Sequence, residues 1–443
     1  MPGSQNISPY YGITFSIVTF SIVEVCLQGV FVMFKRAFTV GLSVIVILSL
    51  LVVTPVYGLD EDVTEYDTVE VMKIMSNTSL TDLKAKAAIL MDCSTGTILL
   101  EKNSHEKLPI ASITKIMSML LIMESIDQGI ISYDTKVNVS EYSWGFGGSQ
   151  VWLEPGEVFT VDEMLKAIAI HSANDATVAM AEAIAGSEEA FVGMMNQKAR
   201  ELGMNDTSFL DCSGLTDVGH YSSAHDIAVM SRELLTKHPE ITKYTSTWQA
   251  KFRDNVPGKK AVSLDNTNKL VRHYKGTVGL KTGYTGAAGH CLSASAVRDS
   301  QQLISVVLGE PDSNTRFAES RKLLDYGFAN FETVMVNAKD EPVQQVTVKK
   351  GLQPVTNAVF KDDVKLLLKK GEKGKIERII ALKDNLTAPV KSGQKIGEVT
   401  FVISGNEVGK ADLVASSDVQ RVSFLKIMYR LMQEWFCMGR TAV

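Results

Sequence analysis

The sequence predicts an α+β protein in which an antiparallel sheet carries a helical lobe, followed by a small all-β module and a C-terminal amphipathic helix. In residues 84–334, short apolar or alternating runs lie near both ends and runs with helical period lie between them. This order is typical of one antiparallel sheet with its helices gathered in a lobe. Lys-rich alternating patterns then cover residues 335–413. A helical period returns in residues 414–443.

Length and composition describe an ordinary globular chain of two or three domains. It has 443 residues, of which 45% are hydrophobic and 21% charged. The net charge of −5 gives no indication of nucleic-acid binding, so no nucleic acid is expected as a partner. The cysteines have no C-x-x-C spacing, which argues against a zinc site or a disulfide framework and leaves a single bridge open. They are Cys26, Cys93, Cys212, Cys291 and Cys437.

The N-terminal region has the pattern of an export signal. Lys35 and Arg36 precede an apolar run over residues 37–53, and small residues before Leu59 offer a cleavage site. We therefore predict a signal region at 1–58 and a flexible lead-in at 59–83, with an uncleaved anchor helix as the alternative. A second apolar stretch precedes this signal, so Met33 is the expected true start; a two-span membrane hairpin is the other interpretation.

The elements of residues 84–334 follow from period and turn residues. Two strands flank a turn at Gly96, and Thr160 with Glu163 forms a capping box that begins a helix reaching about Ile170. Further helices are predicted at 176–185, 188–203, 224–235 and 313–331, and strands at 277–283, 291–297 and 302–308. In the all-β module, strands are predicted at 343–348, 364–368, 376–382, 395–403 and 408–413.

Ser112 and Lys115 stand at i and i+3 at the start of a largely apolar run. Residues 113–123 are apolar on nearly every side of a helix, which indicates a buried helix too short to span a membrane. A buried lysine is costly unless it is paired. An amine beside a hydroxyl on one helix face is an arrangement that activates a serine nucleophile. The alternative is an N-capping serine with a chance lysine.

Two further motifs follow in the chain. Ser172 and Asn174 fall on a tight connection between two predicted helices, where side chains can point into a cleft. Lys281, Thr282 and Gly283 lie on a predicted strand whose edge could accept a peptide. The alternatives are helix caps for the first motif and a solvated strand end for the second.

The histidines give little support for a metal site. His220 and His225 are five residues apart and do not share a helical face, and no H-E-x-x-H occurs. No G-x-S-x-G motif is present either, which disfavours a Ser–His–Asp hydrolase. We expect no metal and no organic cofactor.

Taken in order, Ser112-x-x-Lys115, Ser172-x-Asn174 and Lys281-Thr282-Gly283 resemble the penicillin-binding protein and serine β-lactamase superfamily. The resemblance is closest to low-molecular-mass D-alanyl-D-alanine carboxypeptidases and covers about residues 84–413. It implies a β-lactamase/transpeptidase-like domain at 84–334, a β-sandwich-like domain and a terminal helix. Further matching segments are Asp92-x-x-Thr95-Gly96, Pro109-x-Ala111-Ser112-x-Thr114-Lys115, Leu153-x-x-Gly156, Ser172-x-Asn174-Asp175 and Leu202-Gly203-Met204.

The implied reaction removes the terminal D-alanine from peptidoglycan stem pentapeptides through an acyl-enzyme, and β-lactams would inhibit it by acylation. Ser112 would attack the carbonyl, with Lys115 as general base if burial and a nearby cation lower its pKa. Lys281 would be that cation and, with Thr282, would bind the substrate carboxylate. Ser172 would relay a proton to the leaving amine, and Asn174 would orient the substrate amide and Lys115.

The resemblance also places the oxyanion hole. The backbone N–H groups of Ser112 and Tyr284 would stabilise the developing charge. Lys281, Thr282, Gly283 and Tyr284 would form the substrate-binding strand.

The expected location of the protein is the outer face of the cytoplasmic membrane or the cell wall of a bacterium.

Three alternatives stay open. A D,D-endopeptidase would use the same site, so the sequence does not decide between a carboxypeptidase and an endopeptidase. It also does not decide whether the substrate is the peptidoglycan of the vegetative wall or that of the spore cortex. A class A β-lactamase needs a deacylating glutamate, and no E-x-x-L-N lies between Asp175 and Lys281. A non-catalytic penicillin-binding scaffold would be expected to have lost motif residues, and none is lost.

The C-terminal segment has the pattern of a membrane-surface helix. Lys426, Arg430, Gln433 and Glu434 fall in one sector, and apolar residues including Trp435 fill the rest. Four basic residues against Glu434 give residues 419–443 a net charge of +3. Such a helix lies in a membrane interface beside anionic lipid. The alternative is a helix docked on the all-β module.

Overall fold

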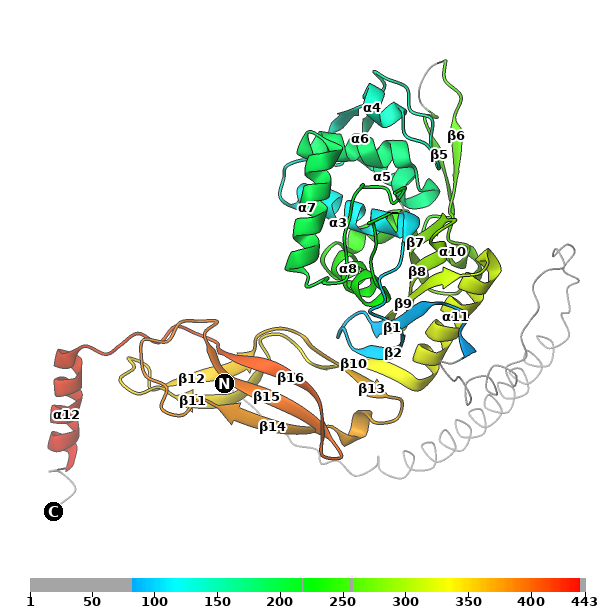
Figure 1. Ribbon diagram of the computed structural model, residues 1–443. Helices are drawn as coiled ribbons and strands as arrows, with labels where there is room; N and C mark the ends of the chain where they lie inside the picture. The colour runs from blue at the N-terminus through cyan, green and yellow to red at the C-terminus, as the bar shows by residue number, and fades with distance from the viewer. Residues whose placement is uncertain (1–81, 217, 255–257, 439–443) are drawn as a thin grey trace, which may run out of the picture. The chain divides into compact units, whose positions relative to one another are not determined.

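A computed structural model describes residues 82–438, except 217 and 255–257 (Figure 1). The predicted signal region at 1–58 and nearly all of the lead-in at 59–83 lie outside the described residues. Those predictions therefore stay as they stand.

A five-stranded antiparallel sheet organises the first part of the described chain. Its strand order is β2-β1-β9-β8-β7, so β7 forms one edge. The strands are β1 (Ala87–Asp92), β2 (Ile98–Lys102), β7 (Thr277–Thr285), β8 (Gly289–Arg298) and β9 (Gln301–Glu310). These positions confirm the predicted strands on both sides of the helical segment and place the third motif on an edge strand.

Both faces of this sheet are covered. Ile89 and Val306 pack with the helical lobe, whereas Leu90 and Val307 belong to the cluster formed with α11 (Ser313–Asn330). Figure 1 shows α11 along one side of the strands and the lobe on the other. All six residues of β1 are buried, which explains why its sequence is a continuous apolar run and not an alternating one.

The helical lobe contains the helices predicted between the strands. Glu163 N donates to Thr160 Oγ1 and Thr160 N donates to Glu163 Oε2, which confirms the capping box. The helix after this box continues as a π-turn to His171. The helices between β2 and β7 are α3 (Lys115–Asp127), α4 (Glu141–Trp144), α5 (Val161–Lys166), α6 (Asn174–Ala185), α7 (Glu188–Glu201), α8 (Ala224–Lys237), α9 (Thr242–Thr245) and α10 (Leu270–His273). Leu270 of α10 packs in the cluster formed with α11 and not in the lobe, and the short α4, α9 and α10 were not predicted. Two two-stranded antiparallel sheets also lie between β2 and β7, β3 (Lys136–Asn138) with β4 (Val158–Thr160) and β5 (Gln249–Phe252) with β6 (Val262–Asp265).

The C-terminal module is all-β, as predicted. A two-stranded sheet pairs β10 (Phe331–Asn337) with β13 (Val364–Lys369), and a five-stranded sheet has the order β11-β12-β16-β15-β14. Residues of both sheets, among them Leu366 and Phe401, form one core. The other strands are β11 (Pro342–Thr347), β12 (Val355–Phe360), β14 (Glu377–Leu382), β15 (Lys395–Ile403) and β16 (Asn406–Ala415).

The module extends beyond the predicted limits of 335 and 413. Phe331 begins β10 directly after α11, and this strand was missed because no turn residue separates it from the helix. At the other end, Val419 and Val422 are buried, and Val419 N donates to Val390 O at 2.8 Å. The terminal helix, α12 (Phe424–Met438), therefore begins about ten residues later than the predicted 414.

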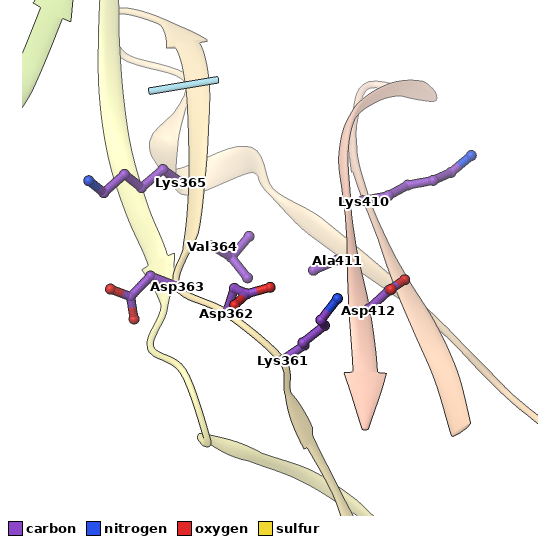
Figure 2. Close-up of a pocket in the computed structure, with 8 residues that line it drawn as sticks. All are labelled: Lys361, Asp362, Asp363, Val364, Lys365, Lys410, Ala411 and Asp412. Atoms are coloured by element: carbon purple, nitrogen blue, oxygen red, sulfur yellow. The ribbon is translucent and has the colours of Figure 1, made fainter. Parts of the chain in front are cut away.

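A shallow pocket in this module carries charges of both signs. Figure 2 shows Lys361, Lys365 and Lys410 beside the aspartates that line it with them. Asp412 forms an ion pair with Lys395, and Asp363 accepts a hydrogen bond from Lys339 N. None of the predicted site residues lines this pocket.

Candidate active site

Ser112 lies on a 3-10 turn, Ala111–Thr114, and the α-helix begins only at Lys115. The turn is held in an unusual backbone conformation, since Ala111 has φ 49°. Thr114 Oγ1 donates to Ala111 O at 2.8 Å. On the other side, a Cβ at Gly214 would lie 1.9 Å from Ala111 O, so only glycine permits this approach. The surroundings thus fix the peptide that carries Ser112.

His220 supports the same turn. Leu210 N donates to His220 Nδ1 at 3.1 Å, and His220 Nε2 lies 2.7 Å from Thr114 Oγ1. His225 instead pairs with Asp226. Within the part of the chain that the structure describes, no group of three or more His, Cys, Asp or Glu is placed to hold a metal ion.

Lys115 connects the first two motifs. Its Nζ lies 3.0 Å from Ser112 Oγ, 2.6 Å from Asn174 Oδ1 and 2.7 Å from Ser213 O. The side chain is fully buried, and this burial lowers the pKa of Lys115 to about 8, although Cys212, Asp211 and Asp175 act in the opposite direction. We expected burial and a neighbouring cation to lower this pKa together; burial lowers it, and the charge effects that act on Lys115 raise it.

Ser172 and Asn174 occupy the two ends of the connection between helices. Ser172 ends the π-turn in a left-handed conformation with φ 66°, and α6 begins at Asn174, two residues earlier than predicted. Asn174 Nδ2 donates to Gly147 O at 2.7 Å, which aims its Oδ1 at Lys115. Both side chains are buried.

Lys281 and Thr282 are buried on the edge strand β7. Lys281 Nζ donates to Thr282 O at 2.9 Å, and Thr282 Oγ1 donates to Thr267 Oγ1 at 2.6 Å. Burial lowers the pKa of Lys281 well below its usual value, and repulsion from Lys115 and Arg316 adds to this effect. The Lys281 amine of the third motif is therefore close enough to the Lys115 amine of the first motif to be repelled by its positive charge.

Gly283 and Tyr284 complete the strand segment. A Cβ at Gly283 would lie 2.6 Å from Ile110 O, so a larger residue would push β7 away from the Ser112 turn. Tyr284 is exposed and stacks on His290 with ring centroids 4.4 Å apart.

One part of the site was not predicted from the sequence. Ser213 O accepts from Lys115, and Asp211 shapes its loop by accepting from the backbone N–H groups of Ser213 and Thr216. Burial acts to raise the pKa of Asp211, but His220 and these N–H groups lower it to about 2. An aspartate two residues before a Ser-Gly pair, as in Asp211-Cys212-Ser213-Gly214, is an Asx-turn signal, and it could have marked the loop.

Comparison with known proteins agrees with this geometry. Residues 73–312 match the family described as D-alanyl-D-alanine carboxypeptidase, and residues 331–421 match the C-terminal domain of penicillin-binding protein 5. D-alanyl-D-alanine carboxypeptidase DacF of Bacillus subtilis is 45% identical over 353 residues, covering 80% of this chain and 90% of that protein.

Solved structures agree as well. Penicillin-binding protein 5 from Haemophilus influenzae has a TM-score of 0.71 at 31% identity, covering 78% of this chain and 100% of that chain. Penicillin-binding protein D2 from Listeria monocytogenes, in its ampicillin bound form, has a TM-score of 0.50 at 30% identity, covering 56% of this chain and 98% of that chain. The sheet, the lobe and all three motifs lie inside the matched residues, which confirms the fold and enzyme class that the motifs predicted. The chain belongs to the D-alanyl-D-alanine carboxypeptidase family of serine peptidases.

Proposed function

We propose that this site removes the terminal D-alanine from peptidoglycan stem pentapeptides through an acyl-enzyme on Ser112. The observation that carries the proposal is the buried Lys115 amine, 3.0 Å from Ser112 Oγ, with a pKa lowered to about 8. A neutral amine has two N–H donors and one lone pair. Because Asn174 Oδ1 and Ser213 O can only accept, they take both donors and leave the lone pair for the Ser112 hydroxyl. Lys115 is thus the general base for attack.

The edge of β7 binds the substrate backbone by strand addition. The substrate's terminal carboxylate meets Lys281 and the Thr282 hydroxyl, and a bound carboxylate favours the charged form of Lys281. Asn174 orients the substrate amide, and Ser172 relays a proton to the leaving D-alanine amine. The backbone N–H groups of Ser112 and Tyr284 hold the oxyanion. Water then hydrolyses the ester.

The same acyl-enzyme step explains inhibition by β-lactams, since a relative of 30% identity is described in an ampicillin bound form. The test is to incubate the purified protein with a fluorescent penicillin and, separately, to measure D-alanine release from a pentapeptide. Cleavage of a crosslinked peptide dimer in place of the pentapeptide would assign a D,D-endopeptidase. Labelling without hydrolysis of either peptide would contradict the proposal.

Replacement of Lys281 tests carboxylate recognition. Lys281→Ala is expected to lower kcat/KM roughly ten- to hundredfold on a peptide with a free C-terminal carboxylate. A C-terminally amidated peptide should lose much less, because it has no carboxylate to pair with the ammonium. An equal loss on both peptides would show that Lys281 acts on Lys115 or on folding and not on recognition.

We further propose that the enzyme is exported by the signal region 1–58 and held at a membrane surface by α12. No helix among the described residues combines the length and apolarity that crossing a bilayer requires. Several apolar side chains of α12 are instead exposed, among them Phe424, Leu425 and Trp435. This exposure, with the net positive charge of the segment, fits a helix that lies in an anionic interface.

Trimming the chain after Val422 tests the anchor. The cut has to spare Val419 and Val422, because a cut after Leu413 would remove the end of β16 and two buried residues. The trimmed, signal-processed protein is expected to leave anionic vesicles in a flotation assay and to keep its activity in solution. A full-length variant in which Phe424 and Leu425 are both changed to serine should also bind anionic vesicles less than the wild type does. Undiminished vesicle binding of the trimmed protein would rule out α12 as the anchor.

A further inference from the structure

Trp152 combines two unfavourable properties at one position. Its φ is 50°, in the left-handed region that bulky residues rarely adopt, and its side chain is 62% exposed. A bulky residue in this conformation is strained and persists only where its surroundings hold it. Since an exposed indole adds nothing to the core, the conformation has no evident role in the stability of the fold.

Two side chains, Asp175 and Arg253, hold the backbone around Trp152, and Glu157 in turn binds Arg253. The N–H groups of Val151 and Leu153, on either side of it, donate to the Asp175 carboxylate at 3.1 Å each. Trp152 O accepts from Arg253 Nη2 at 2.7 Å, and the same nitrogen bonds Glu157 Oε2. These partners come from α6, from the residue after β5 and from the residue before β4. The fold therefore fixes the backbone that carries this exposed indole.

Residues 147–149, which lead into the held segment, contact the same asparagine that accepts from Lys115. Asp175 follows Asn174, whose side chain bonds both Lys115 Nζ and Gly147 O, and Asn174 N donates to Ser149 O at 2.7 Å. Gly283 of β7 packs against the turn that carries Ser112. A continuous series of contacts thus runs from β7 through Ser112 and Lys115 to the segment that leads into Trp152.

A peptide paired with the edge of β7 and attacked by Ser112 would have that segment as its opposite wall. Leu215 adds exposed apolar surface there, because its Cδ1 would lie 3.6 Å from a Cβ at Gly148. We propose that Trp152 is a specificity residue that packs against the stem-peptide residues preceding the D-alanyl-D-alanine pair. This assignment rests on the proposed function, and it makes the enzyme prefer long stem peptides over short ones.

The test compares two substrates in wild type and Trp152→Ala. One is N-acetyl-D-alanyl-D-alanine, which lacks the preceding residues, and the other is the full pentapeptide. The ratio of kcat/KM for the pentapeptide to that for the short substrate is expected to fall about tenfold, mainly through KM. Trp152→Phe should restore most of the ratio, because it keeps an aromatic surface. Ile130→Ala, an exposed position beyond the far end of α3, should leave the ratio unchanged.

Trp152→Gly separates recognition from folding. Glycine adopts this φ without strain, so the thermal midpoint of the Trp152→Gly protein should equal or exceed that of the wild type. The preference of this variant for the pentapeptide should nevertheless be lost. An unchanged ratio in both variants, or equal losses on the two substrates, would overturn the assignment. Penicillin labelling is measured in parallel. Failure of wild type to label would contradict the proposed function itself, whereas normal labelling with an unchanged ratio would contradict only the role of Trp152.

Discussion

Ser112→Ala is expected to abolish covalent labelling by penicillin and to lower D-alanine release by a factor on the order of 10⁴ or more. The change removes one oxygen, the atom 3.0 Å from Lys115 Nζ that would form the ester. The turn that carries it is held by Ala111, Thr114 and Gly214, none of which depends on the Ser112 hydroxyl. The thermal midpoint should therefore change little. Gel fluorescence after penicillin treatment and calorimetry measure the two outcomes.

Ser118→Ala is a matched control on the adjoining helix. Its hydroxyl is buried and donates to Cys212 O at 2.6 Å, three residues along the chain from Lys115. Losing this bond should cost about 1 kcal/mol of stability and leave labelling intact. Labelling that persists in Ser112→Ala, or that disappears in Ser118→Ala without unfolding, would contradict the choice of nucleophile.

Lys115→Ala is expected to be nearly as severe as loss of the nucleophile, and the double variant should be little worse than either single one. Residues that act as one catalytic unit are not additive. Lys115→Arg should fail as well, because a guanidinium does not deprotonate and cannot take the serine proton. Single-turnover acylation by penicillin measures this step directly. A double variant that loses the product of the two single effects would show that Lys115 and Ser112 act independently.

If Lys115 is the general base, the rate of acylation has to increase with pH. The base must be neutral, so the acylation rate should rise as pH increases through the lowered pKa of Lys115, about 8, and level off above it. An unburied lysine would put that rise near pH 10.5. In Lys115→Ala the residual acylation rate should not show this rise with pH. A wild-type rate that falls through the same range would mean that the ammonium, not the amine, is the active form.

Local sequence determined much of the architecture. The apolar run at 113–123 is buried on nearly every side of α3, as its period requires. The capping box at Thr160 begins α5, and the turn residues near 286 and 299 separate three antiparallel strands. These features depend on neighbours a few residues away, so they can be read along the chain. The spacing of Ser112 and Lys115 belongs to the same class, because one helical turn brings both side chains to one face.

Only the tertiary structure decided the properties that depend on distant partners. The low pKa of Lys115 arises from burial by the whole lobe, and its third acceptor, Ser213 O, lies 98 residues away in the chain. The left-handed backbone at Ala111 and Trp152 is imposed by Gly214, Asp175 and Arg253, which no local pattern places nearby. The start of β10 at Phe331 is set by pairing with β13, not by a turn signal. Periodicity reports which side of an element faces the core; it carries no information on which remote group completes a hydrogen bond or holds a strained peptide.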